Sequence, residues 1–272
     1  MFRKNVARQF PADRISNSKY DATNESLKGT PHNACFLERN VTAFDAEFFG
    51  MSSDEDLGAD PQQRVLLEVT YRALEDVQAI VAGCDILLSP DCFIALSALG
   101  FLSPDGVCQS FDSRANGYGR GEGFGVLIIK SVDDAVRDGD TIRAIIRATG
   151  TNQNGRTTLA HPSKEMQAQL IQSLYDKAQL NPLDTQFFEA HGTGTAIGDP
   201  LEAMAIGKVF GRGRSLDQPL IIGALKANIG HLEGCTGIAG VLQTILVLEH
   251  GTIPSTIPSL TGTNLASAET HG

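Results

Sequence analysis

The sequence has no excess of positive charge, no long uninterrupted apolar run and no cysteines at metal-binding spacing. Its formal net charge is −10 over 272 residues, which argues against a general binder of nucleic acid or of an anionic membrane surface. A local basic patch for an acidic partner stays open. The longest apolar segment, GIAGVLQTILVLEHG, is too short to cross a bilayer. We therefore expect no nucleic-acid partner and no membrane insertion.

Cysteine usage indicates a reduced compartment. The N-terminus MFRKNVARQFPADR is polar and has no secretory apolar region. The five cysteines are an odd number and form no metal-type pattern, so we expect no metal and a cytoplasmic protein. They are Cys35, Cys84, Cys92, Cys108 and Cys235.

The composition is that of a folded globular protein, with 42% hydrophobic and 20% charged residues. Residues 1–40 are polar and irregular, and we expect a surface arm there. From residue 41 onward, helical and strand patterns alternate. Examples are a capped helix from Asp60 to about Val77, strands over 80–88 and 141–155, and a helix over 163–180. This alternation predicts a mostly parallel sheet wrapped by helices.

One junction lacks the turn that this pattern requires. The helix that begins at Asp60 leads directly into the apolar strand AIVAGCDILL, and no glycine, proline or asparagine separates Gln78 from Ala79. Connections between helix and strand normally take a few residues with turn chemistry. The chain therefore reads as if two distant segments had been joined here.

Two histidines occupy similar positions in the C-terminal half. His191 lies in EAHGTGT and His231 in NIGHLEG, each in a glycine-rich turn between an apolar strand and a helix, and Lys226 lies five residues before His231. A single buried histidine is more often a core residue than a catalyst. Two imidazoles delivered by such turns indicate a functional site. The acids of GDPLEA, Asp199 and Glu202, are interpreted as a capping box for the next helix.

The loop FDSRANGYGRGEG is rich in glycine, as phosphate-binding loops are. It has neither the G-x-G-x-x-G pattern before a helix nor the G-K-[ST] of a P-loop, and it precedes a strand. We therefore do not expect nucleotide binding. We predict instead that its charged residues, Arg120 and Glu122, orient Lys226.

Six motifs follow one another over about residues 41–258: DPQQRVLLEV, SPDCFIALSALGFLSPDG, FDSRANGYGRGEG, NQNGRT, EAHGTGTAIGDPLEA and LKANIGHLEG. In this order they resemble the ketosynthase (beta-ketoacyl synthase) domain of type I, fungal-like polyketide synthases. The resemblance implies a thiolase-like α/β fold of two related halves in five layers, αβαβα. Residues 41–131 would form an incomplete N-terminal half, and residues 132–272 the C-terminal half with both histidines.

The resemblance also implies a chemistry. Ketosynthases transfer an acyl group to a cysteine thiolate and condense it with a malonyl unit on the phosphopantetheine of an acyl carrier protein, without a cofactor of their own. His191 and His231 match the family's catalytic histidines, and Lys226 its supporting lysine. Thr193 and Thr195 match threonines near the pantetheine arm. Acyl carrier protein and malonyl or acyl thioesters are the implied partners.

The family's nucleophile is missing. Its cysteine lies in a DTACSSS-like motif, within the segment absent at the junction after Gln78. Cys235 lies near a helix start four residues after His231, where a thiolate would be favoured, but a small residue in a tight helix–strand contact is the better interpretation. We therefore predict a ketosynthase-type protein without condensing activity.

Three alternatives stay open from the residues alone. The chain could decarboxylate malonyl thioesters, because that half-reaction uses the histidines more than the cysteine. It could be a non-catalytic partner that forms a homodimer or pairs with an intact ketosynthase. It could also be the product of a mis-joined exon, which would aggregate through unpaired sheet edges.

Overall fold

The computed structural model of the chain describes residues 7–9, 11, 31, 33–38, 40–73, 79–153 and 162–256. Short 3-10 helices cover Pro182–Asp184 and Glu233–Cys235. The other elements in chain order are β1 (Arg8–Gln9), β2 (Asn33–Ala34), α1 (Ser53–Gly58), α2 (Pro61–Ala73), β3 (Ala79–Asp85), α3 (Asp91–Ala98), β4 (Gly123–Ile129), α4 (Val132–Asp138), α5 (Lys164–Ala178), β5 (Phe187–Glu189), α6 (Gly198–Phe210), β6 (Ile221–Gly223), α7 (Lys226–Ile229) and α8 (Thr236–His250).

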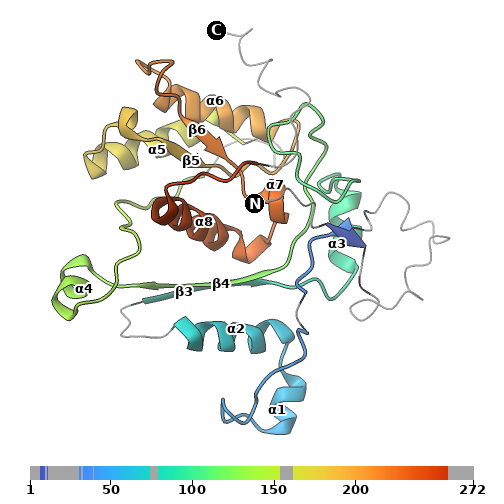
Figure 1. Cartoon of the computed structure of the whole chain (residues 1–272). Coiled ribbons are helices and arrows are strands. Elements are labelled where there is room, and N and C mark those ends of the chain that lie inside the picture. The colour runs from blue at the N-terminus through green and yellow to red at the C-terminus, as the bar shows by residue number, and fades with distance from the viewer. Residues whose placement is uncertain are drawn as a thin grey trace.

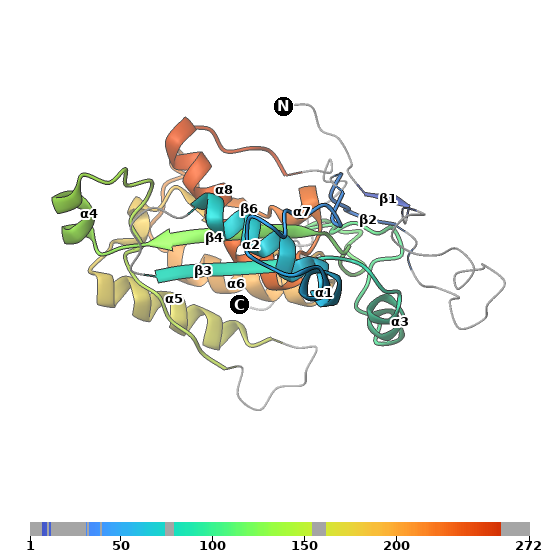
Figure 2. The same ribbon diagram turned by 90° about the horizontal axis from the view of Figure 1, so that it is seen from below.

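The central elements stack in five layers (Figure 1). Helix α2 packs on one face of the β3–β4 pair and α8 packs on the other face. Beyond α8 lies the β5–β6 pair, and α5 and α6 form the outer layer. In the view from below, α2 lies in front of the β3–β4 pair, which it contacts (Figure 2). The order of layers is αβαβα, which confirms the layering implied by the resemblance.

The strand layers are narrow. The described residues form three two-stranded sheets, and of these only β5–β6 is parallel. β3 and β4 are antiparallel, from Ala79 opposite Ile129 to Asp85 opposite Gly123. The predicted mostly parallel sheet is therefore wrong for this chain. A wider sheet needs neighbouring strands, and the described residues supply one partner for each strand.

The predicted strand over residues 141–155 is also wrong over its described part. Residues 141–153 lie outside any helix or strand, and the side chains of Ile142, Ile145 and Ile146 are 41%, 55% and 54% exposed. A strand requires a neighbour to take its backbone hydrogen bonds, whatever its own sequence favours. No described strand is hydrogen-bonded to this segment, so its strand-like pattern is not realised.

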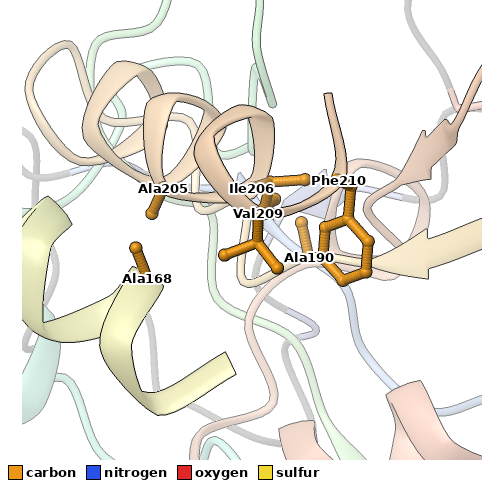
Figure 3. Packing of buried hydrophobic residues seen from close by; sticks show 6 residues of the cluster. All are labelled: Ala168, Ala190, Ala205, Ile206, Val209 and Phe210. Carbon is orange, nitrogen blue, oxygen red and sulfur yellow. The ribbon is translucent and has the colours of Figure 1, made fainter. Parts of the chain in front are cut away.

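One core joins α5, α6 and the end of β5. Phe210 contacts Tyr175 and Phe188 edge-on, with ring centroids 5.2 and 5.6 Å apart. The buried members of this cluster are Ala168, Ala190, Ala205, Ile206, Val209 and Phe210 (Figure 3). Because Ala190 belongs to it, the packing fixes the chain at the position directly before His191.

A second core contains part of the predicted surface arm. Ala34 and Phe36 pack with Leu87, Phe93 and Leu102, and Ala34 is fully buried. Residues 33–36 therefore differ from the expected exposed arm, while Arg8 and Gln9 of β1 are exposed. Residues 12–30 of the arm lie outside the described residues.

Helix α2 begins as the sequence predicts. Pro61 is its first residue, and the Asp60 carboxylate accepts the backbone N–H of Gln62 at 2.7 Å. Val65 is 1% exposed and anchors the helix.

The junction at Gln78 falls in residues 74–78, outside the described part, and β3 begins at Ala79. None of the helices in the described ranges combines the length and apolar character needed to span a bilayer.

Candidate active site

The turn that carries His191 is held by the carboxylate of Glu202. After β5 ends at Glu189, the N–H of Ala190 donates to the carbonyl of Gly223 at 2.9 Å, which continues the pairing with β6. The next two N–H groups, those of His191 and Gly192, donate to the two oxygens of Glu202 at 2.6 and 2.8 Å. Hydrogen bonds to a charged acceptor are stronger than those between neutral groups, so this clamp orients the His191 backbone firmly.

Asp199 holds the remainder of the same turn. Its carboxylate is 1% exposed and accepts N–H groups from Gly194 at 3.1 Å and Phe111 at 2.8 Å. Burial raises its pKa, and the backbone N–H groups oppose that rise. The predicted capping box is therefore wrong. Helix α6 begins at Gly198, so Asp199 and Glu202 lie within its first turn or two and bind the histidine loop instead of the helix start.

Glycine is required in this loop at Gly194. Its φ is +82°, and a Cβ added there would lie 2.5 Å from the backbone nitrogen of Gln109. Only glycine adopts this conformation without strain, and only a residue without a side chain lets the two backbones pass so closely.

His231 is positioned by the glycine-rich loop GYGRGEG. The N–H of His231 donates to the carbonyl of Gly119 at 2.7 Å, and the N–H of Gly121 donates to the carbonyl of His231 at 2.9 Å. Gly230 allows this contact, because its φ is +77° and a Cβ there would lie 2.7 Å from the Arg120 carbonyl oxygen. The loop therefore supports the site through His231.

The structure gives Arg120 and Glu122 contacts other than the predicted ones. The two oxygens of Glu122 accept the N–H groups of Leu37 at 2.8 Å and Leu87 at 2.9 Å, which ties residue 37 to the segment after β3. The guanidinium of Arg120 lies 3.0 Å from Asp85 and 3.6 Å from Glu233. Glu122 thus holds the scaffold around the site, and its role in orienting Lys226 stays a prediction.

Lys226 is surrounded by acids that sequence reasoning did not assign to the site. Its side chain is 7% exposed, and burial lowers its pKa, while the charges of Glu202, Glu189 and Asp199 act in the opposite direction. One oxygen of Glu189 accepts the N–H of Leu225 at 2.7 Å, and the other is buried without a hydrogen-bond partner among the described residues. The sequence could have indicated Glu189 as a site residue, because it lies two positions before His191.

The imidazole rings of His191 and His231 lie edge to face. The ring centroids of His191 and His231 are 5.8 Å apart, with an interplanar angle of 86°. Burial, then the charge of Lys226, lowers the pKa of His191 to about 4 and that of His231 to about 3. His191 is the more exposed of the two, so water screens part of this effect there. Both rings are neutral near pH 7.

One hydrogen bond fixes the tautomer of His231. Its Nδ1 accepts the backbone N–H of Glu233 at 2.9 Å, and the Thr236 hydroxyl lies 3.2 Å from the same atom. A neutral imidazole carries one proton, and Nδ1 is occupied as an acceptor. The proton is therefore on Nε2, which makes His231 a hydrogen-bond donor at its other ring nitrogen.

The histidines open onto a cleft of about 1830 Å³. Glu189, His191, Lys226 and His231 line it together with apolar residues of β4, α8 and the segment 142–146. Thr193 is buried, and the Thr195 hydroxyl accepts the N–H of Gly198 at 3.1 Å at the start of α6. Neither threonine lines this cleft, so their contact with a pantetheine arm stays a prediction.

Burial disfavours the thiolate form of four cysteines. Burial raises the pKa of Cys35 and Cys235 to about 11 and that of Cys108 to about 12, and it also raises the pKa of Cys84. Cys235 is 2% exposed, and its Sγ would lie 3.3 Å from a Cβ added at Gly125. It is therefore the small residue in a tight helix–strand contact that the sequence favoured. Cys92 is exposed on α3.

The sequence matches two parts of one family. Residues 143–259 match the family model described as beta-ketoacyl synthase, C-terminal domain. The model of the N-terminal domain matches residues 2–79 and 77–135, and these two stretches meet at the junction where the turn is missing.

Relatives with related sequences are fungal polyketide synthases. The chain is 52% identical to the highly reducing polyketide synthase NEC1 of Pyricularia oryzae over 225 residues, which is 81% of this chain and 8% of that protein. It is 36% identical to the highly reducing polyketide synthase azaB of Aspergillus niger over 338 positions, covering 90% of this chain and 13% of the relative. The chain thus spans about a tenth of the relatives' length.

A solved structure shares the fold. The ketosynthase from module 6 of the bacillaene synthase from Bacillus subtilis 168 superposes on 96% of this chain with a TM-score of 0.87, at 27% sequence identity, and the chain covers 59% of it. The fold is therefore that of ketosynthases, with part of it absent.

The length of the alignment with azaB shows how many residues of the ketosynthase domain this chain lacks. Ninety per cent of this 272-residue chain is about 245 residues, whereas its alignment with azaB runs over 338 positions. About 90 aligned positions are therefore occupied in the relative and empty in this chain.

Proposed function

The chain belongs to the beta-ketoacyl synthase family, and we propose that it retains the histidine chemistry of a ketosynthase without the nucleophile that condensation needs. The observation that supports this proposal is the pair of neutral imidazoles 5.8 Å apart on the wall of an open cleft. Burial raises the pKa of Cys35, Cys84, Cys108 and Cys235, which disfavours the thiolate that condensation needs.

The reaction that this arrangement supports is decarboxylation of a malonyl thioester. The bond between the carboxylate carbon and the α-carbon breaks, CO₂ leaves, and the electron pair passes into an enolate whose oxygen becomes negative. The Nε2–H of His231 can donate to that oxygen, and the neutral ring of His191 supplies a second donor. A proton from water then converts the enolate into an acetyl thioester.

Lys226 has an electrostatic role in this proposal. Its positive charge lowers the pKa of both histidines, so they remain neutral donors while the enolate forms. The acids Glu189, Glu202 and Asp199 balance that charge, which lets Lys226 stay buried. Lys226 is therefore a positioning residue and does not attack the substrate.

Condensation requires a step that this chain does not supply. The growing acyl chain must form a thioester with an enzyme thiolate before the enolate carbon attacks it. The cysteines with raised pKa are thiols at neutral pH, and a thiol is a poor nucleophile. We accordingly assign no condensing activity to this polypeptide.

The substrate class follows from the family. We infer that a malonyl unit on the phosphopantetheine of an acyl carrier protein enters the cleft, with Thr193 and Thr195 near the pantetheine arm. We also infer a cytoplasmic location, which suits five free cysteines.

Incubation of the purified chain with malonyl-carrier protein tests the proposal. The expected result is formation of acetyl-carrier protein, measured by mass spectrometry, at a rate above that of the His191→Ala, His231→Ala double variant. Leu216→Ala is a suitable control, because Leu216 is 97% exposed and does not line the cleft. Equal rates for the chain and the double variant would refute the assignment.

A further inference from the structure

Apolar residues lie uncovered on two surfaces of the chain. The first is the start of β3, where residues 79–82 are exposed and Ile80 and Val81 are 43% and 42% exposed. β3 pairs only with β4 among the described strands, so its other edge presents free backbone N–H and carbonyl groups.

The second surface is the wall of the cleft. Ile145 and Ile146 are 55% and 54% exposed, and they face the same cavity as Leu246 and Leu248 of α8, which are 51% and 65% exposed. The segment 142–146 has a strand-like sequence, and none of the described strands pairs with it. Exposed apolar groups and an unpaired strand edge are both typical of surface that a second polypeptide covers.

The comparisons indicate what covers it. Relatives carry about 90 more positions within the aligned region, and the matches to the N-terminal family model meet at residues 77–79, directly before β3. The segment that relatives insert here therefore enters the fold next to the exposed strand. Because 96% of the chain superposes on an intact ketosynthase, the surface that receives the segment is already formed.

We propose that the free edge of β3 and the apolar wall of the cleft are two docking sites for this segment, presented by a separate polypeptide of the same family. Binding would pair a strand with β3 and cover the isoleucines of 142–146. A preformed surface favours such binding, because little conformational entropy is lost on the side of this chain.

A second copy of this chain fits less well. It would lack the same segment, so it could not provide the strands that are missing. Each copy also carries a net charge of −10, which opposes self-association. The proposal concerns binding alone and does not depend on the histidine chemistry.

The test mixes the purified chain with the corresponding segment of azaB, fused to a soluble carrier protein, and measures binding by sedimentation and calorimetry. We expect a one-to-one complex that Val81→Lys and Ile145→Lys each weaken at least tenfold. Leu216→Lys, at a 97% exposed position outside this surface, is expected to leave the affinity unchanged. Far-UV circular dichroism checks that each variant folds.

Hydrogen exchange provides an independent readout with the unaltered chain. The amides of residues 79–82 and 142–146 are expected to gain protection in the complex. Absence of a complex would overturn the proposal, as would a complex in which neither substitution weakens binding and neither segment is protected. A concentration-dependent homodimer weakened by the same substitutions, without binding of the azaB segment, would assign the surface to a second copy instead.

Discussion

The carboxylate of Glu202 binds the backbone of His191, with its oxygen 2.6 Å from the His191 nitrogen. Glu202, which holds the backbone of His191 in place, thus lies on α6, eleven positions later in the chain. Its second oxygen accepts the N–H of Gly192 at 2.8 Å, so one side chain satisfies two donors of the turn.

Removing this carboxylate should therefore loosen the His191 turn. Glu202→Ala leaves two N–H groups without their acceptor, and we expect a loss of about 1–3 kcal/mol in the free energy of unfolding. Glu202→Gln retains one acceptor oxygen and should lose less. Chemical denaturation measures both. Glu165→Ala, at an exposed glutamate of α5, serves as control and should change stability by less than about 0.5 kcal/mol. If Glu202→Ala lowered the free energy of unfolding no more than Glu165→Ala does, the hydrogen bonds from His191 and Gly192 to Glu202 would not stabilise the fold as we expect.

The backbone conformation of Gly194 gives a second prediction. Gly194→Ala adds both the strain of a positive φ and a clash 2.5 Å from the Gln109 nitrogen. Gly139 provides a matched control, since its φ is +76° and a Cβ there meets nothing within 4 Å. We expect Gly139→Ala to cost about 1–2 kcal/mol from strain alone and Gly194→Ala to cost more. Equal costs, measured by thermal or chemical unfolding, would show that the close approach at Gly194 is absent in solution.

The histidines should make stability depend on pH. Their pKa values fall from 6.5 to about 4 for His191 and about 3 for His231 in the folded chain. Between pH 6.5 and these values the unfolded state binds more protons, so the free energy of unfolding falls as the pH falls through this window. Each histidine contributes at most about 1.4 kcal/mol per pH unit, and His191 less because of its exposure.

The buried acids oppose this trend, because burial raises the pKa of Glu202 and Asp199 and they take up protons more readily when folded. A comparison isolates the histidines. The double variant His191→Asn, His231→Asn should show a flatter dependence than the unaltered chain between pH 7 and 5, measured by urea denaturation at each pH. Parallel curves for the two proteins would contradict the lowered pKa values.

Much of the fold followed from local patterns. The cap at Asp60, the helix over Lys164–Ala178 and the turns that carry His191 and His231 all form where the residues predicted them. Each depends on short-range chemistry, namely a capping acid, a helical apolar stripe or a glycine with positive φ. The break after Gln78 was also visible, because a missing turn is a local feature.

The errors came from contacts between distant residues. TIRAIIRATG has the composition of a strand, yet no neighbour pairs with it, so its pattern could not decide its structure. Asp199 and Glu202 have the spacing of a capping box. Their carboxylates instead accept the backbone N–H groups of Gly194 and His191, respectively. The contacts of Arg120 with Asp85 and of Glu122 with Leu37 and Leu87 were also not predicted, because sequence spacing does not bring these residues together.

The absence of an acyl-accepting thiol is the central claim, and intact mass spectrometry tests it directly. The chain is incubated with an acyl thioester and malonyl-carrier protein, and its mass is followed during any turnover. We expect an unchanged polypeptide mass, because the buried cysteines remain protonated thiols. Stoichiometric acylation of any cysteine, coupled to release of a condensed product, would contradict the account.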